Sequence, residues 1–216
     1  MSEWWTYRLT SFLLFSPRTY HRLFELYNQA IWPAPILGLL IGVAIIVLLV
    51  GTYRHRDRVI AGLLATCWLW IAWAFLYPRY TQINWVAPWI AGAFALQGLL
   101  LGGLGVVGGR IAFAPPGGGR FRLVLALIAT VIVGYPLLAP LFGRAWTVAE
   151  VFGAAPDPTA IATVAVLALV KGRTRWPLLV VPVLACGLAA LTQWAMAEPE
   201  AIVIATASLL ALILAF

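Results

Sequence analysis

Residues 156–173 read PDPTAIATVAVLALVKGR, and this stretch decides how often the chain crosses a membrane. Its apolar run, residues 159–170, contains no charged side chain. A helix of this length rises only about 18 Å, whereas the hydrocarbon core of a bilayer is about 30 Å thick. A crossing here therefore requires the preceding loop to dip into the membrane from outside. We predict that Asp157 caps the helix and that Pro158 lies in its first turn, where a missing N–H costs nothing.

The rest of the chain supplies further apolar runs. Its 216 residues are 63% hydrophobic and 10% charged, whereas a soluble domain carries about 25% charged residues. Five runs are long enough to cross a membrane, and a shorter run reaches the last residue. The sequence therefore predicts an all-α, polytopic transmembrane helix bundle of about seven spans, formed by residues 34–216. The predicted spans are 34–53, 59–77, 85–107, 121–142, 159–170, 176–196 and 201–216.

Basic residues in the loops predict the orientation. Three clusters follow the first, third and fifth spans, so two crossings separate each cluster from the next. The three clusters lie on the same side of the membrane only if residues 159–170 cross it. The positive-inside rule makes that side cytoplasmic. The N-terminus is then outside and Phe216 inside. Three N-terminal residues, Arg8, Arg18 and Arg22, must also lie outside. The nine clustered residues are Arg54, Arg56, Arg58, Arg110, Arg120, Arg122, Lys171, Arg173 and Arg175.

Residues 1–33 predict interfacial amphipathic helices on the outer face. Ser16 followed by Pro17 is a helix-start signal, because the Ser oxygen accepts from a free N–H and Pro fits the first turn. Large side chains then recur at helical spacing, which is typical of a helix lying in the headgroup plane. This stripe comprises Tyr20, Phe24, Tyr27 and Ile31. A shorter stripe before it comprises Trp4, Trp5, Leu9, Phe12 and Leu13.

No Asp, Glu, Lys, Arg or His interrupts the interior of the five long predicted spans, since Arg122 stands at the edge of span 121–142. This argues against a proton-driven pump. We predict no catalytic residue, no metal site and no cofactor, because the sequence offers neither a nucleophile with a base nor a cluster of metal ligands. The predicted binding site is a polar vestibule open to the outside, beside the short fifth span. Its predicted residues are Gln97, Tyr135, Asp157 and Thr159. Two alternatives remain open: a kinked helix pair that binds nothing, and Gln97 as an interhelical hydrogen bond.

Glycines crowd the segment from Gly98 to Gly119, and two pairs have the spacing that lets membrane helices approach closely. The pairs are Gly98 with Gly102 and Gly105 with Gly109. We therefore expect span three to pack tightly against a neighbour or a partner subunit. The expected partners are membrane lipids, with anionic headgroups at the cytoplasmic basic loops, and either another membrane protein or a second copy of this chain. Nucleic acid is not expected, because the basic residues form short clusters rather than one face.

A set of short motifs resembles a bacterial integral membrane family known as a domain of unknown function. The motifs are Phe15-Ser16-Pro17, Tyr27-Asn28, Trp32-Pro33, Trp68-Leu69-Trp70, Ile83-Asn84, Leu96-Gln97-Gly98, Tyr135-Pro136, Phe152-Gly153 and Pro156-Asp157-Pro158-Thr159. The resemblance covers nearly the whole chain and implies the architecture, but it implies no activity. Members of the family often carry Cys before the Pro-Thr pair, where this chain has Asp157. Any thiol chemistry of relatives is therefore in doubt for this protein.

The leading functional hypothesis is a structural or accessory subunit of a membrane complex, because buried charge is absent and the glycines favour close packing. Enzymatic activity is not expected. The first alternative is a channel or carrier for a small neutral or weakly polar solute, which the vestibule and the short fifth span would suit. The second alternative is a lipid-active membrane enzyme. All three hypotheses describe a multi-pass protein of the bacterial inner (plasma) membrane.

Overall fold

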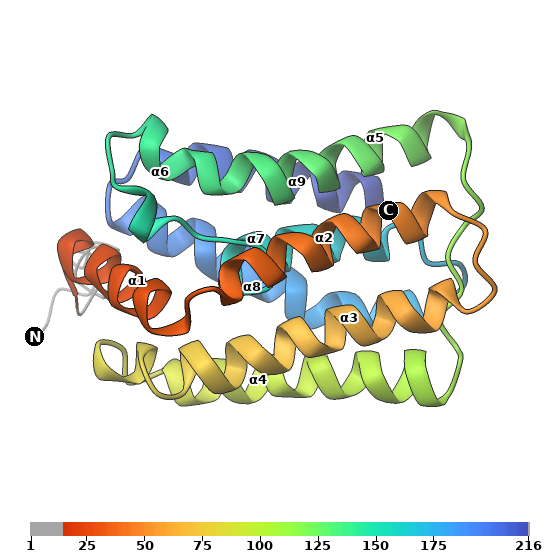
Figure 1. Ribbon diagram of the computed structural model, residues 1–216, viewed down its shortest axis with the longest axis horizontal. Coiled ribbons are helices and arrows are strands. Elements are labelled where there is room, and N and C mark those ends of the chain that lie inside the picture. Colours follow the sequence, from red (N-terminus) through yellow and green to blue (C-terminus); the bar gives the residue numbers. More distant parts are fainter. Residues whose placement is uncertain (1–14, 216) are drawn as a thin grey trace, which may run out of the picture.

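The computed structural model describes residues 15–215 as a helical bundle, most of whose helices follow one long axis (Figure 1). Among these residues there is no β-strand and one isolated bridge, between Phe113 and Val170. The all-α prediction is confirmed. The α-helices are α1 Pro17–Ile31, α2 Ala34–Val50, α3 Arg56–Trp70, α4 Ala87–Leu100, α5 Gly118–Ala129, α6 Leu138–Leu141, α7 Pro156–Leu167, α8 Arg175–Ala195 and α9 Glu200–Ala215. Tighter or wider helical turns are η3 Ile71–Leu76, η4 Tyr80–Gln82, η5 Leu101–Val107, η6 Thr130–Gly134, η7 Tyr135–Leu137 and η8 Trp146–Val148.

Helices occur at each of the seven predicted spans, but their lengths differ. Within residues 15–215, four helical stretches are long and apolar enough to cross a membrane, and α1 with α2 makes a fifth if this pair, bent by 88°, is counted as one. α9 is apolar but shorter, and α7 has 12 residues. The four stretches are Arg56–Gln82, Ala87–Val107, Gly118–Leu141 and Arg175–Ala195.

The outward faces of these helices are strongly apolar. Tryptophan and aliphatic side chains are among the most exposed in the structure, and Val107 is 82% exposed. A water-soluble monomer rarely exposes large apolar patches of this kind, whereas lipid tails would cover them. The helices are therefore compatible with a membrane location. Other examples are Trp73, Trp85, Trp89, Leu99, Leu141 and Trp194.

α1 begins where the sequence predicts. Ser16 Oγ accepts a hydrogen bond from the N–H of Thr19 at 3.3 Å, and Pro17 occupies the first turn. The predicted stripe contributes Tyr20, Phe24 and Tyr27 to the buried face. α1 lies across one end of the bundle, which we name the α1 end (Figure 1). The opposite end carries the loops after α2, η5 and α7, at which the basic residues cluster, and we name it the basic end (Figure 1). The shorter predicted stripe, from Trp4 to Leu13, lies outside the described residues.

α7 lies inside the bundle, where it contacts α3, α5, α8 and α9 (Figure 1). Every residue from Asp157 to Leu167 is buried. Residues 151–155, which lead into the helix, are buried as well. α7 and its leading loop therefore form the centre around which the longer helices pack.

Threonine side chains satisfy backbone groups in this centre. Thr159 Oγ1 donates to Ala155 O at 2.7 Å and accepts from the N–H of Gly153 at 2.8 Å. Thr163 Oγ1 donates to the O of Thr159 at 2.7 Å and accepts from Trp68 Nε1 at 3.0 Å. An unpaired polar group would be costly in such apolar surroundings. These bonds allow irregular backbone to enter the core.

α7 begins two residues earlier than predicted. Its N-cap is Ala155 and its first residue is Pro156, so Asp157 is the second helical residue and makes no capping hydrogen bond. The prediction of Asp157 as N-cap and Pro158 as first residue is wrong. The reason is that the first N–H groups of any helix lack an intrahelical acceptor, so both prolines fit in this turn. The carboxylate of Asp157 is consequently available to other partners.

Two glycines allow the loop before α7 to cross α2 at very short range. Gly38 in α2 faces Phe152 O, and a Cβ atom at position 38 would clash with that oxygen. Gly153 has φ +79°, and a Cβ atom there would lie 3.1 Å from Gly38 Cα. The two segments therefore pack backbone against backbone.

The glycines of the third predicted span pack within the chain. A Cβ atom at Gly98 would lie 2.6 Å from Leu69 Cγ, and one at Gly105 would clash with Ala61 Cβ. Both neighbours belong to α3, so the glycines bring α4 and η5 close to α3. Gly102 has no atom within 4 Å of its ideal Cβ position. The expected close packing is thus found against a neighbouring helix of the same chain.

Arg56 holds the loops of the basic end together. Its guanidinium donates to Gly51 O at 3.0 Å and to Ala114 O at 3.2 Å, which joins the turn before α3 to the loop after η5. That loop is joined in turn to the end of α7, because the N–H of Ala114 donates to Leu169 O at 2.8 Å. The exit from α7 is therefore fixed by backbone pairing.

The glycine crossing predicts a position-specific loss of stability. Gly38→Ala should lower the free energy of unfolding by about 1–3 kcal/mol, because the added methyl group meets a backbone oxygen that cannot turn away. Gly92→Ala in α4 is the matched control, since nothing lies within 4 Å of its ideal Cβ position. The measurement is thermal unfolding of both variants in the same detergent. Equal stability of the two variants would contradict the close crossing.

Candidate functional site

A cluster of charged side chains lies at the α1 end, and its members come from three separate segments. Arg144, in the loop after α6, forms an ion pair with Glu200 at the start of α9. Its Nη1 lies 3.7 Å from Glu198 Oε2, in the turn between α8 and α9. The same Nη1 lies 2.9 Å from Nε2 of His21 in α1, and this Nε2 lies 3.1 Å from Glu198 Oε1. The cluster therefore fastens α1 and the α6 loop to the α8–α9 turn.

Arg144 is the cation of this cluster at neutral pH. Burial lowers the pKa of His21, Arg144 acts in the same direction, and Glu198 opposes them. A histidine with a lowered pKa is neutral near pH 7. The glutamates therefore depend on the guanidinium for their counter-charge.

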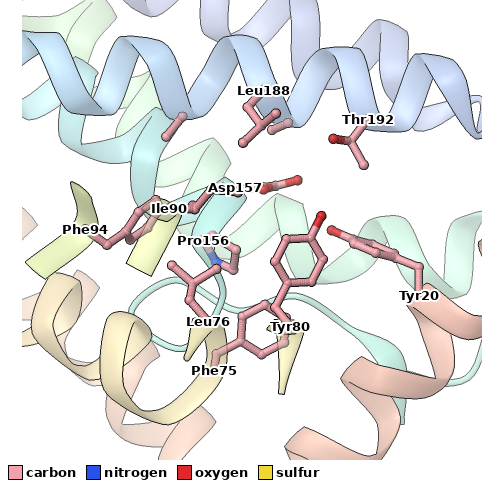
Figure 2. Close-up of a pocket in the computed structure, with 12 residues that line it drawn as sticks. Tyr20, Phe75, Leu76, Tyr80, Ile90, Phe94, Pro156, Asp157, Leu188 and Thr192 are labelled. Carbon is pink, nitrogen blue, oxygen red and sulfur yellow. The ribbon is translucent and has the colours of Figure 1, made fainter. Parts of the chain in front are cut away.

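Next to this cluster lies a set of oxygen-bearing side chains that we name the carboxylate chamber. It consists of Tyr20, Tyr80, Tyr135, Glu150, Asp157 and Thr192. Tyr135 OH lies 3.5 Å from Asp157 Oδ2, and Tyr20 OH lies 3.5 Å from Glu150 Oε1. Figure 2 shows the hydroxyl groups of Tyr20 and Tyr80 directed toward the same space as the carboxylate of Asp157. The chamber therefore gathers two acids and several hydroxyls from α1, η4, η7, α7 with its leading loop, and α8.

Two small cavities flank these side chains. The first, of about 40 Å³, lies among Tyr20, Tyr80, Asp157 and Thr192 and has an apolar wall that includes Phe75 and Phe94 (Figure 2). The second, of about 20 Å³, is lined by polar residues that include Tyr135, Glu150, Arg144 and Gln193. Volumes of this size hold one to a few water-sized particles. The chamber is therefore too small for an organic solute of drug size.

Aromatic packing holds the chamber in place. The ring of Tyr20 contacts Phe24 at 5.1 Å between centroids and Tyr80 at 6.5 Å, and Tyr80 stacks on Phe75 at 6.0 Å. Asn28 of α1 donates to Ala149 O at 2.9 Å, directly before Glu150. α1 thus sets the positions of both Tyr20 and the loop that carries Glu150.

Glu150 lies in the loop before α7, and its carboxyl group is buried. Burial raises the pKa of Glu150 well above its usual value, the carboxylate of Asp157 acts in the same direction, and Arg144 and Tyr20 oppose them. Its Oε2 is buried without a hydrogen-bond partner in the part of the chain that the structure describes. Glu150 therefore keeps a proton at a pH at which exposed glutamates are ionised. Such a group can exchange that proton for a cation.

The four residues predicted for the vestibule separate in the structure. Tyr135 and Asp157 lie together in the chamber. Thr159 points into its own turn, where its hydroxyl donates one hydrogen bond and accepts another. Gln97 donates from Nε2 to Leu178 O at 2.9 Å and links α4 to α8, as the interhelical alternative requires. Its Oε1 is buried and has no partner among residues 15–215.

Four chamber residues were not found from the sequence. Tyr20 was assigned to an apolar stripe, and Tyr80, Glu150 and Thr192 lie in or near turns outside the predicted span centres. The one usable signal was Glu150, an isolated acid seven residues before Asp157 in an otherwise apolar segment. No group of three or more His, Cys, Asp or Glu residues that could hold a metal ion occurs in the described chain.

Comparison with known proteins gives a family. A model described as "Family of unknown function (DUF6064)" matches residues 18–216. The chain belongs to this family. No curated protein and no solved structure matches it. The resemblance to a domain of unknown function is therefore confirmed, and membership assigns no activity to the site.

The charged cluster predicts a large effect of removing its cation. Arg144→Met should lower the free energy of unfolding by about 3 kcal/mol or more, because it leaves buried Glu200 without a counter-charge. Adding Glu200→Gln to this variant should recover part of the loss. Thermal unfolding of the single and double variants measures both effects.

Arg22→Met is the matched control, since the Arg22–Glu25 pair is largely solvent-exposed and should contribute less than about 1 kcal/mol. An Arg144→Met protein as stable as Arg22→Met would show that the cluster does not hold the α1 end together.

Proposed function

We propose that the protein crosses a bacterial inner membrane seven times, with its N-terminus outside and its C-terminus in the cytoplasm. The loops with clustered basic residues all lie at the basic end, which supports a cytoplasmic position for that end (Figure 1). α7 would cross together with its buried leading loop, since irregular backbone is tolerated at membrane depth when protein surrounds it. α1 would lie in the outer headgroup region, across the ends of the other helices.

We further propose that the carboxylate chamber binds a small monovalent cation and that the protein carries this cation across the membrane. The observation that carries the proposal is the pairing of Glu150 with Tyr20 and of Asp157 with Tyr135 between two small cavities. The hydroxyl of Tyr80 faces the same space as Asp157 (Figure 2). Oxygen atoms are the ligands that small hard cations prefer. Carriers commonly place such sites where a helix begins or ends inside the bundle. α7 begins in this way at Pro156.

The charge balance of the α1 end supports a cation. Arg144 is the cation that acts on Glu150, Glu198 and Glu200, and the carboxylate of Asp157 lies close enough to raise the pKa of Glu150. Buried acids without a counter-charge are expensive and must be protonated or paired. A bound proton or cation removes this cost. The chamber can therefore exchange one for the other.

The size and walls of the chamber limit the ligand. A cavity of about 40 Å³ accepts an ion such as sodium, potassium or ammonium and excludes bulky solutes. Aromatic rings such as Phe75 and Phe94 can face a cation favourably. A small cation therefore fits better than the neutral or weakly polar solute proposed from the sequence.

An accessory-subunit role is the second candidate. Its sequence support came partly from glycines expected to contact a partner, but Gly98 and Gly105 contact α3 of the same chain. The open face beside Gly102 is the observation that still favours a partner helix. Native mass spectrometry of protein purified from its host would detect a stoichiometric partner. A lipid-active enzyme ranks third, because the two cavities beside the buried acids, of about 40 and 20 Å³, are too small for a headgroup.

Cation binding is tested by stabilisation of the purified protein. Sodium, potassium or ammonium chloride should raise the unfolding temperature relative to choline chloride at equal ionic strength, because a ligand present at 100 times its Kd stabilises by about 2.7 kcal/mol. Asp157→Asn and Glu150→Gln should each raise, at least tenfold, the cation concentration needed for the same increase in unfolding temperature. Glu25→Gln, an acid at the same end outside the chamber, should leave it unchanged.

The effect should also decline as the pH falls, because protons then occupy the carboxylates that the cation needs. Uptake of the stabilising cation into proteoliposomes then tests transport. Equal stabilisation by choline and by the small cations would contradict the proposal.

A further inference from the structure

A larger cavity lies at the basic end, at the opposite end of the bundle from the carboxylate chamber. Its volume is about 520 Å³, and it lies between the first turns of α5 and α8 and the end of α7. Three of its lining residues are cationic, Arg120, Lys171 and Arg175, and none is acidic. The other lining residues are Ala114, Pro115, Gly117, Phe121, Ala168, Leu169, Val170, Gly172 and Trp176. We name this space the basic pocket.

Arg120 is held at one wall of the basic pocket by the ends of two helices. It donates to Leu214 O at 2.6 Å near the end of α9 and to Ala168 O at 3.3 Å at the end of α7. Carbonyl oxygens at helix C-termini carry partial negative charge and favour a cation. These bonds fix the guanidinium in position, so that the wall of the pocket is positive without any rearrangement.

Arg175 and Lys171 supply the donors that remain. Arg175 packs over the ring of Trp176, with Cζ at 4.5 Å from the ring centroid. Its Nε is buried and has no hydrogen-bond partner in residues 15–215. A buried guanidinium N–H without an acceptor is costly. Because Arg175 lines the pocket, its guanidinium group can meet an anion there. Lys171 is exposed and adds a mobile positive charge at the rim.

We propose that the basic pocket binds the phosphate headgroup of an anionic phospholipid. Arg175 and Lys171 contact the phosphate, and Arg120 contributes its positive field. The volume greatly exceeds that of a phosphate group and has room for its glycerol moiety. The helices beside the pocket carry exposed aliphatic side chains one turn further on, Leu123 in α5 and Val180 in α8, along which acyl chains can lie. Trp176 has the amphipathic ring that is common at headgroup depth.

The proposal concerns a different site from the carboxylate chamber, so each can fail without the other. The test measures the unfolding temperature of the purified protein in a neutral detergent with added phosphatidylglycerol, phosphatidylcholine or inorganic phosphate. Phosphatidylglycerol should raise the unfolding temperature by several degrees, and phosphatidylcholine should not. Native mass spectrometry of the same samples should show retained phosphatidylglycerol.

Lys171→Gln and Arg175→Gln should each raise, at least fivefold, the phosphatidylglycerol concentration needed for the same increase in unfolding temperature. Lys171 is exposed, so its replacement should not impair folding even if Arg175→Gln does. Arg54→Gln is the matched control, because Arg54 is exposed at the same end, carries the same charge and does not line the pocket. It should respond to lipid as the unaltered protein does.

Two results would overturn the proposal. An equal response of Lys171→Gln and Arg54→Gln would show that lipid acts on the general charge of this end and not on the pocket. Inorganic phosphate as effective as phosphatidylglycerol, and lost in the same variants, would show that the pocket serves a soluble phosphate compound.

Discussion

The burial of α7 is the constraint on which the rest of the structure depends. A helix without an exposed side must pack every side chain, and the loop that leads into it must pair its backbone groups away from water. Thr159 and the hydroxyl of Tyr27 satisfy this loop, the latter by donating to Ala154 O at 3.0 Å. Gly38 lets α2 pass directly over it. α1 and α2 therefore both pack on this loop, and the carboxylate chamber takes Tyr20 from α1 and Glu150 from the start of the loop.

The two ends of the bundle differ in the sign of their charged side chains. At the α1 end, acids from loops and from the first turns of helices lie inside the protein, where Arg144 and tyrosine hydroxyls contact them. At the basic end, arginines bind helix-terminal and loop carbonyls, and Arg175 still has a donor without an acceptor. Small cations would suit the first end and anionic headgroups the second. This polarity agrees with a cytoplasmic basic end, because anionic lipid is abundant there.

Periodicity and apolar run length predicted a helix at each span, the start of α1 at Pro17 and the existence of the short helix α7. They failed at the first turn of α7, because two closely spaced prolines both satisfy the rules for a helix start. The sequence rules also missed Glu150 as a buried acid. A loop acid is normally solvated, and only the return of the loop into the bundle buries it. Tyr135 and Asp157 were predicted together because both adjoin prolines in the outer parts of spans. Thr159 was grouped with them because it follows Asp157 in the chain, and Gln97 because of its depth. Neither criterion specifies the direction in which a side chain points.

The crossing of α7 is tested most directly by labelling its two flanks in intact cells. Ala145→Cys lies before the helix and Arg173→Cys after it, both at exposed positions, and the natural Cys67 and Cys186 are buried. With a membrane-impermeant maleimide, Ala145→Cys should be labelled in intact cells, and Arg173→Cys only after the membrane is permeabilised. Labelling of both positions from the same side would contradict a crossing by α7 and, with it, the seven-span arrangement.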